Sequence, residues 1–533
     1  MLATIVGQHA KQSAALLRQS LNIVCGHKYL ATNSSVGSVP NEKLSEFESI
    51  IAAEKLKANN YLLIEDKCDV LSRLTPATLS QLLETRVDRV HKWQFSQNNC
   101  ALVELYDPDY RLNRYILRNF GITTDKKQPP KYNLKFLSLN SCPKLLLPTN
   151  RHSTAANNSG QRSEVIRELT SRRRDAYYLN ASFMKQSFKT NDEIMKYLVS
   201  DKDFDDLDLK LRFYIISQLE QYICQSYFKS YHILPFGSSI AGLGTPNSDL
   251  DLVLTPRQVS DPTQSSREDD RQRLKSNLNL IADLLQYSIP YYSHFSRILS
   301  ARVPIVKFGF DLAPIDIDLS IELSPHSVHS GVYMSAFLNY CIRLNPCVRD
   351  LILFLRLWAK QHKLLKPKNW STHLIYNGFT SFQLTSLVIY FLQIQNILPP
   401  MSHFMQPSGQ PFITNKQNTD TLDLLAKFFE FVLSISYQWE AISILNARTY
   451  GNPDQQLPIW MENPFQTELN MCRNITHEKF ERFLVIAQLS AQIMTSTDGY
   501  SLADILDKEL YMSSLANGAK LCSRIAVKDL FNE

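Results

Sequence analysis

The sequence has few features that would place it in a membrane or in an oxidising compartment. Its best candidate for a membrane span, residues 384–398, is broken by Gln393, Gln395 and Asn396, so no membrane span is expected. The nine cysteines are scattered and form no Cys-x-x-Cys pair, which favours reduced, buried thiols over a zinc site or a disulfide framework. A net charge of +6 suits a nucleic-acid groove but is too small for a histone-like binder.

The first 41 residues contain no aspartate or glutamate. They carry Lys11, Arg18 and Lys28 among serine, alanine and leucine, and residues 3–23 can fold as an amphipathic helix with a basic edge. This composition is typical of a mitochondrial transit peptide. We therefore predict a transit peptide over residues 1–41 and a location in the mitochondrial matrix. The alternative is a disordered tail.

Residues 58–140 alternate between strand-like and helix-like segments. The expected order is strand, helix, strand, strand, helix, strand, over residues 61–65, 75–85, 91–95, 100–105, 110–119 and 132–139. This order resembles the RNA-recognition-motif family of ferredoxin-like folds, whose central strands stack bases on aromatic side chains. The corresponding strand, residues 99–105, has no aromatic residue, which favours a protein-contact role. Residues 141–175 begin with a stretch rich in Pro, Asn, Ser and Thr, which predicts a linker.

Four acidic residues occur in two strand-like segments in the middle of the chain. Asp249 and Asp251 lie two apart in an apolar run, and Asp316 and Asp318 alternate with Ile and Leu further on. Residues two apart point to the same face of a strand, so each pair projects together. Carboxylates held side by side are costly without a cation, and Mg²⁺ is commonly bound by one or two carboxylates and substrate phosphates. The pattern predicts a metal-dependent phosphoryl-transfer site.

A bend at Gly237-Ser238 precedes the first acidic pair. Glycine lets the backbone come close to a ligand, and exposed amides and a hydroxyl can bind phosphate oxygens. A Gly-Ser bend, a short spacer, Asp-x-Asp and a later acidic strand together resemble the nucleotidyltransferase superfamily that includes DNA polymerase beta. The resemblance implies an α+β fold, with a nucleotidyltransferase palm (a mixed sheet with helices) over residues 231–325 and a helical lead-in over residues 176–230.

The rest of the chain has mostly helical patterns. Within residues 348–364, Arg356 and Lys360 lie one turn apart on one helix face, where two cations repel unless both address an anion such as a triphosphate. The motifs "PFGSS", "ILSARVPIVKF", "DIDLS", "NGFTSFQLT" and "ENPF" resemble the poly(A)/poly(U) polymerase branch of the superfamily, and its mitochondrial members in particular. This resemblance implies a helical poly(A)-polymerase-associated domain over residues 326–505 and a C-terminal tail over residues 506–533.

The resemblance also implies roles for individual residues. Asp249, Asp251 and Asp318 would be catalytic and would hold two Mg²⁺ (or Mn²⁺) ions, with Asp318 preferred over Asp316 because it directly precedes a Leu-Ser pair. The base of the nucleotide would stack on Phe382. Its phosphates would contact Gly237, Ser238, Ser239, Arg356, Lys360 and Ser381.

These features predict template-independent addition of adenylate to the 3′ end of RNA, with ATP as the second substrate and mitochondrial transcripts as acceptors. Uridylyl-selective relatives carry a histidine before the asparagine that follows their Asn-Pro-Phe motif, whereas this chain has Leu469 before Asn470, which favours ATP. A terminal uridylyltransferase on the same fold, or an inactive RNA-binding scaffold, is the alternative. The mitochondrial relatives further imply a homodimer formed through the RNA-recognition-like domain.

Overall fold

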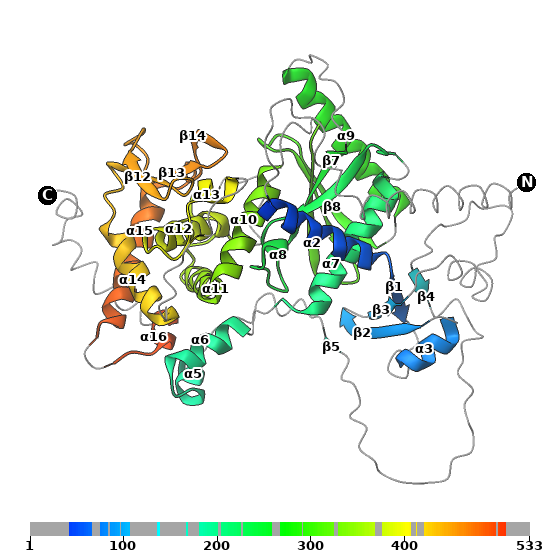
Figure 1. Ribbon diagram of the computed structural model, residues 1–533, viewed down its shortest axis with the longest axis horizontal. Coiled ribbons are helices and arrows are strands. Elements are labelled where there is room, and N and C mark those ends of the chain that lie inside the picture. Colours follow the sequence, from blue (N-terminus) through cyan, green and yellow to red (C-terminus); the bar gives the residue numbers. More distant parts are fainter. Residues whose placement is uncertain are drawn as a thin grey trace, which may run out of the picture.

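The structure is a computed structural model of the 533-residue chain (Figure 1). The residues that it describes are 42–66, 75–83, 86–95, 98–106, 136–138, 167–168, 181–200, 204–224, 227–257, 267–289, 291–323, 329–367, 376–406, 412, 420–496 and 499–507. The expected transit peptide, the expected helix over residues 110–119, and nearly all of the expected linker and C-terminal tail lie outside these residues. No helix in the described part combines the length and the apolar character that crossing a membrane requires.

A mixed sheet of five strands forms the centre of the molecule, in the order β6-β7-β10-β9-β8. β7 and β10 run parallel, and the other neighbours run antiparallel. Leucines of β7 and isoleucines of β10 fill one face, while the acidic residues alternate onto the other. This sheet confirms the predicted palm. Its strands are β6 (Tyr231–Phe236), β7 (Leu250–Pro256), β8 (Tyr292–Ile298), β9 (Ile305–Phe310) and β10 (Ile315–Ile321).

Helices cover the palm sheet. α9 (Arg267–Ser288) packs on β8, β9 and β10, and α7 (Asp206–Leu219) packs on β6. α7 begins with a capping box, in which the side chains of Asp205 and Asp208 each accept a hydrogen bond from the other residue's backbone N–H. It continues through a π-helical turn, η5 (Glu220–Cys224), and the chain then enters β6.

The first described helix, α2 (Glu42–Ala58), packs on the palm and crosses α7 and α10 (Ser330–Leu344) (Figure 1). Its apolar side chains, such as Phe47, belong to the same buried core as the palm. Lys55 pairs with Glu220 at 2.6 Å and donates to the carbonyl oxygen of Ile233 in β6 at 2.9 Å. This helix was not predicted from the sequence.

The N-terminal sheet has the strand order β4-β1-β3-β2-β5, with α3 (Pro76–Leu83) between β1 and β2 in the chain. β1, β3 and β2 pair antiparallel. β4 pairs in parallel with β1, whereas a ferredoxin-like arrangement places its last strand antiparallel there. The strands are β1 (Tyr61–Asp66), β2 (Val87–Phe95), β3 (Asn98–Leu105), β4 (Phe136–Ser138) and β5 (Arg167–Glu168).

One face of the N-terminal sheet is docked on the palm. Trp93 is buried, and its indole N–H donates to the carbonyl oxygen of Leu312, in the turn between β9 and β10, at 2.8 Å. Cys100 and Leu102 on the same face join the palm core, and α3 packs against the opposite side (Figure 1). The face that RNA-recognition motifs use for bases is therefore covered by protein, which agrees with the absence of aromatic residues on β3.

The C-terminal half is mostly helical, as predicted, but it also contains a four-stranded sheet in the order β12-β11-β13-β14. The strands are only four or five residues long, too short to give a clear alternation in the sequence. They are β11 (Glu440–Ser443), β12 (Arg448–Gly451), β13 (Trp460–Asn463) and β14 (Gln466–Asn470). The helices after α10 are α11 (Pro346–Gln361), α12 (Ser381–Ile394), α13 (Met401–Met405), α14 (Thr421–Ser434), α15 (His477–Met494) and α16 (Leu502–Leu506).

The short helices α5 (Ala181–Ser187) and α6 (Asn191–Ser200) pack against this C-terminal half, where they contact α11 and α16. The side chain of Asn191 bonds to the backbone of Tyr500 and Leu502. The segment expected to lead into the palm therefore first packs on the helical region and reaches the palm only at α7.

Candidate active site

Asp251 and Asp318 lie side by side on the two parallel strands of the palm. The register pairs Asp251 of β7 with Asp318 of β10, so both carboxylates project from the same face of the sheet. Asp249 lies two residues before Asp251, and its charge acts on both of these carboxyl groups. The structure thus places two of the three acids singled out in the sequence side by side, and the charge of the third, Asp249, acts on both.

Gly237 lies against Asp251. Its φ is +80°, and a Cβ added there would lie 2.1 Å from Asp251 Oδ2. A side chain is therefore excluded by both the backbone conformation and the space. The amide of Gly237 donates to Ser335 Oγ of α10 at 2.8 Å, which ties the bend to the helical region. The bend and the acids form one compact unit.

Ser238 and Ser239 begin the short helix α8 (Ser238–Ala241) after this bend. Ser239 is buried, and its hydroxyl donates to the carbonyl oxygen of Asp249 at 2.7 Å. Ser238 is half-buried. The hydroxyl of Ser239 therefore connects the bend to the first acid of the motif.

The three carboxylates face one ammonium group. Lys307 of β9 pairs with Asp318 Oδ2 at 2.8 Å. Burial disfavours the charged form of Lys307, but Asp318, Asp249 and Asp251 outweigh burial and raise its pKa. Burial, Asp318 and Asp249 together raise the pKa of Asp251 to about 7. Burial also raises the pKa of Asp318, against the effect of Lys307. One lysine does not compensate this group of acids.

The arrangement fits a divalent cation. Asp318 Oδ1 is buried and has no hydrogen-bond partner among the described residues, although its other oxygen is paired with Lys307. Hard divalent cations prefer carboxylate oxygens, and a bound cation would relieve the repulsion that raises the pKa values of Asp251 and Asp318. Asp249, Asp251 and Asp318 are the residues that could hold it.

The nucleotide residues predicted from the sequence lie at the junction of α11 and α12. Arg356 of α11 donates from Nε to Thr385 Oγ1 at 2.9 Å and from Nη1 to the carbonyl oxygen of Leu243 at 3.2 Å, and Thr385 Oγ1 in turn donates to the carbonyl oxygen of Ser381. Arg356 thus joins the loop after α8 to the first turn of α12.

The other nucleotide residues predicted on α11 and α12 are exposed. Phe382 lies on the first turn of α12 with 43% of its surface exposed. Ser381 precedes it, and Lys360 lies one turn after Arg356 on α11; both are exposed. A capping box between Thr380 and Gln383 fixes this helix start.

Lys307 and Arg212 were not predicted as functional residues from the sequence. Lys307 occurs inside the quoted "ILSARVPIVKF" motif, where a single cation in an apolar strand next to an acidic strand was the available signal. Arg212 occurs in α7 among apolar residues and is completely buried. Two of its acceptors, the carbonyl oxygens of Pro246 and Ser248, are remote in sequence, so only the folded chain reveals them.

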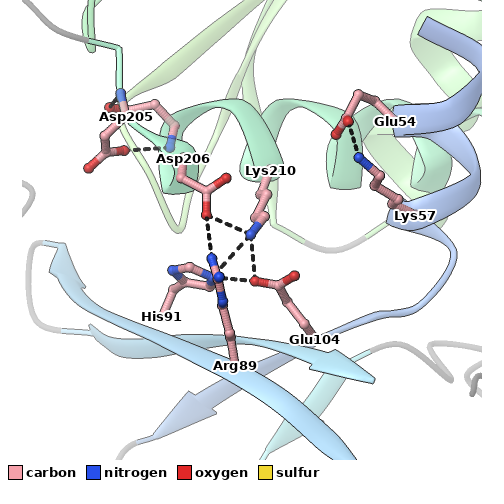
Figure 2. Close-up of polar contacts among 9 residues, drawn as sticks. Glu54, Lys57, Arg89, His91, Glu104, Asp205, Asp206 and Lys210 are labelled. Atoms are coloured by element: carbon pink, nitrogen blue, oxygen red, sulfur yellow. Dashed lines mark hydrogen bonds and ion pairs between the residues drawn. The ribbon is translucent and has the colours of Figure 1, made fainter. Parts of the chain in front are cut away.

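A second group of acids lies between α7 and the N-terminal sheet (Figure 2). His91, Glu104 and Asp206 place ligand atoms within 4.8 Å of one another. The ammonium of Lys210 lies among them, 2.5 Å from Glu104 and 2.6 Å from Asp206. The ammonium of Lys210 therefore occupies the position that a metal ion would take. The group is a contact between the N-terminal sheet and α7 of the palm.

The mixed sheet, the Gly-Ser bend and the acids on two parallel strands define the class of protein as a nucleotidyltransferase with a DNA-polymerase-beta-like palm. Residues 192–340 match the family described as "Poly(A) RNA polymerase, mitochondrial-like, central palm domain". This part of the chain is similar to that family, in agreement with the resemblance seen in the sequence.

Curated relatives carry the same name. The chain is 27% identical over 344 residues to the "Poly(A) RNA polymerase, mitochondrial" of Drosophila melanogaster, a match that covers 57% of this chain and 54% of the relative. It is 27% identical over 342 residues to the protein of the same name from Homo sapiens, which covers 58% of this chain and 56% of the relative. The chain thus spans about half the length of the curated relatives it matches.

Solved structures share the fold. A crystal structure of mtPAP in complex with UTP superposes with a TM-score of 0.69 at 21% identity, covering 86% of this chain and 99% of that chain. The complex of mtPAP with ATPγS gives a TM-score of 0.66 at 21% identity, with coverages of 86% and 99%. The likeness confirms the fold class predicted from the sequence.

Proposed function

We propose that this chain is a template-independent RNA 3′-terminal adenylyltransferase that uses ATP and Mg²⁺ or Mn²⁺. The observation that carries the proposal is the group of three acids, Asp249, Asp251 and Asp318, which lies beside the Gly237 bend and has more negative charge than its one lysine partner, Lys307, can balance. The poly(A) RNA polymerase names of its curated relatives support the choice of RNA and adenylate.

The acids would hold the metal ions, with Asp249, Asp251 and Asp318 as ligands. When bound, divalent ions lower the pKa of an attacking hydroxyl and stabilise the leaving pyrophosphate. The protein aligns the RNA 3′-hydroxyl with the α-phosphorus of ATP on the acidic face of the sheet. Positioning and charge compensation supply most of the acceleration in reactions of this kind.

The residues around the acids would bind ATP. The close approach of Gly237 to Asp251 leaves the bend without a side chain, so phosphate oxygens can approach Ser238 and the backbone next to it. Ser239 supports this bend through its bond to Asp249. Arg356, Lys360 and Ser381 would meet the triphosphate, and the exposed ring of Phe382 would stack on the base.

An extension assay tests the proposal. Purified protein is incubated with an RNA oligonucleotide, ATP and Mg²⁺, and the products are separated by length. Asp249→Ala and Asp318→Ala are expected to abolish tailing. Asp283→Asn, which removes a surface carboxylate that pairs with Arg297, is the matched control and should keep it. Normal tailing by Asp318→Ala would contradict the assignment.

Uridylyl transfer is the alternative, because mtPAP was crystallised with UTP, GTP and CTP as well as with ATPγS, so its site accepts nucleotides other than ATP. The same primer offered each of the four nucleotides separately distinguishes the two activities. Long tails with ATP support the proposal, and long tails with UTP alone reverse it. An inactive scaffold would show no metal-dependent binding of ATP.

A mitochondrial location and a homodimer complete the proposal. The location is supported by the acid-free residues 1–41 and by the names of the relatives. A fluorescent protein that carries residues 1–41 at its amino terminus should enter mitochondria. The same fluorescent protein without these residues should not. A light-scattering mass of one chain at micromolar concentration would contradict the homodimer.

A further inference from the structure

The loop between α8 and β7, residues 242–249, ends at Asp249 and is held through its carbonyl oxygens. The carbonyl oxygen of Gly242 accepts from Arg349 Nε at 3.2 Å, and that of Leu243 accepts from Arg356. The carbonyl oxygen of Asp249 itself accepts from Ser239. Arg212 donates to two further carbonyl oxygens of the loop, those of Pro246 and Ser248.

Arg212 is a completely buried cation beside this loop. Its Nη2 donates to the carbonyl oxygens of Ser248 at 2.5 Å and Pro246 at 3.4 Å, and its Nη1 donates to the carbonyl oxygen of Asp208, one turn earlier in α7, at 3.0 Å. The guanidinium lies over the ring of Phe204, 4.5 Å from its centre. Its Nε is buried and has no hydrogen-bond partner in the described part of the chain.

Burying a charged side chain costs free energy unless hydrogen bonds and opposite charges compensate it. The hydrogen-bond acceptors found for the guanidinium are backbone carbonyls, which satisfy its donors, and the negative charges of Asp208 and Asp249 offset part of the cost of burying its charge. Only a planar fork can reach carbonyls on both α7 and the loop while it stacks on an aromatic ring, so lysine is not equivalent here. The arrangement fixes the backbone directly before Asp249.

The loop has little room to move. Its own turn is closed by the Ser248 amide donating to the carbonyl oxygen of Thr245 at 2.8 Å. A Cβ on Gly244 would lie 3.0 Å from the ring of Phe204 and 3.1 Å from Ser239 Cα. The loop is therefore packed between α8 and the ring of Phe204, on which the Arg212 guanidinium lies. A shift of Arg212 would consequently move the loop and, with it, Asp249.

We propose that Arg212 is a positioning residue that sets the place and orientation of Asp249 for binding a divalent cation. This inference rests on the proposed function, because it treats Asp249 as a metal ligand. Arg212 contacts neither substrate nor metal and acts through the carbonyl oxygens of Pro246 and Ser248. Its loss would weaken cation binding, since residues that orient metal ligands commonly contribute about 10- to 100-fold to affinity.

The test compares Arg212→Lys with Lys210→Met. Both positions are buried cations on α7, but Lys210 faces the N-terminal sheet, and its ammonium pairs, among the described residues, with Glu104 and Asp206 and not with the loop, so it is the matched control. Mn²⁺ is titrated into each full-length protein, and binding is followed by calorimetry without ATP or RNA. We expect the dissociation constant for Mn²⁺ to rise about tenfold in Arg212→Lys and to stay within about twofold of wild type in Lys210→Met.

The kinetic readout separates positioning from simple loss of structure. The initial rate of Arg212→Lys at limiting Mn²⁺ should fall and should recover at saturating Mn²⁺, while KM for ATP stays unchanged. Phe204→Leu keeps the cation but removes the ring on which it rests, so it should shift the Mn²⁺ dependence in the same direction by a smaller factor. It also serves as the test if Arg212→Lys does not fold.

The outcomes distinguish this inference from the proposed function. Wild-type Mn²⁺ affinity in both Arg212→Lys and Phe204→Leu would overturn the positioning role and leave the proposed function intact. Equal losses of affinity in Arg212→Lys and Lys210→Met would also overturn it, because the effect would then come from α7 in general. A wild-type protein that binds no Mn²⁺ would overturn the proposed function and this inference with it.

Discussion

The palm and the domain contact beside α7 each gather carboxylates around one lysine, yet their charges balance differently. At the contact, Glu104 and Asp206 meet Lys210, and Arg89 lies 3.8 Å from Asp206, so two acids face two cations (Figure 2). In the palm, Asp249, Asp251 and Asp318 face Lys307. The first group is internally neutral, and the second has an excess of negative charge.

The pKa values follow this difference. Burial disfavours the ionised form of Glu104, but hydrogen bonds from Lys210 and His91 outweigh burial and hold its pKa below the usual value. The pKa of Asp251 is raised instead. Closely spaced ligand atoms alone are therefore a poor sign of a metal site. An uncompensated charge together with a buried oxygen that has no partner is a better one.

The largest effect is expected from Asp251→Asn. It removes one of the acids that repel each other in the palm, so activity in the extension assay should fall by roughly 10³-fold, the range for loss of one electrostatic group. The thermal stability of the metal-free protein should be maintained or should rise, because like charges are separated. Differential scanning calorimetry without divalent ions measures it. A fall in metal-free stability would contradict the charge excess inferred for the palm.

An intermediate effect is expected from Lys210→Met. The change leaves the half-buried Glu104 and its neighbour Asp206 without their main cation, so unfolding should become easier by about 1–2 kcal/mol. Chemical denaturation followed by fluorescence measures it. Adding Glu104→Gln to Lys210→Met should restore part of the loss, and a double mutant no more stable than Lys210→Met would show that the pair does not interact.

The smallest effect is expected from Asp316→Asn. Asp316 shares a face of β10 with Asp318 and helps to raise the pKa of Asp318, but it pairs with Gly309 of β9, and the pairing of β10 with β7 begins only at Ile317. Extension activity should change by less than about threefold, a difference of under roughly 0.7 kcal/mol in barrier. A loss as large as that of Asp251→Asn would make Asp316 a metal ligand.

The sequence predicted those parts of the molecule that depend on local pattern. Alternation in residues 250–256 and 315–321 located the acid-bearing strands, and the order of elements predicted the palm. It could not supply the register, which pairs Asp318 with Asp251 through contacts between segments more than sixty residues apart. The sequence left Asp316 and Asp318 on the same strand face, and a resemblance was needed to choose between them.

Tertiary contacts explain what the sequence did not reveal. Arg212 and Lys307 look like ordinary cations until the chain folds and brings carbonyls and carboxylates to them. Ser239 was expected at a phosphate, and the fold gives its hydroxyl to the carbonyl oxygen of Asp249. The sheet of β11 to β14 was not predicted, because its strands are too short to show a clear alternation of apolar and polar residues.

The position of α2 changes how the N-terminal half should be dissected. Because α2 belongs to the palm core and precedes the N-terminal sheet in the chain, the sheet is inserted between two parts of the palm and is not placed before it. Truncation of the chain from its amino end would remove α2, which packs in the palm core, before it reached the sheet. An amino-terminal cut that keeps the palm core intact must therefore fall before Glu42, and a variant without the sheet requires an internal deletion that joins α2 to α5.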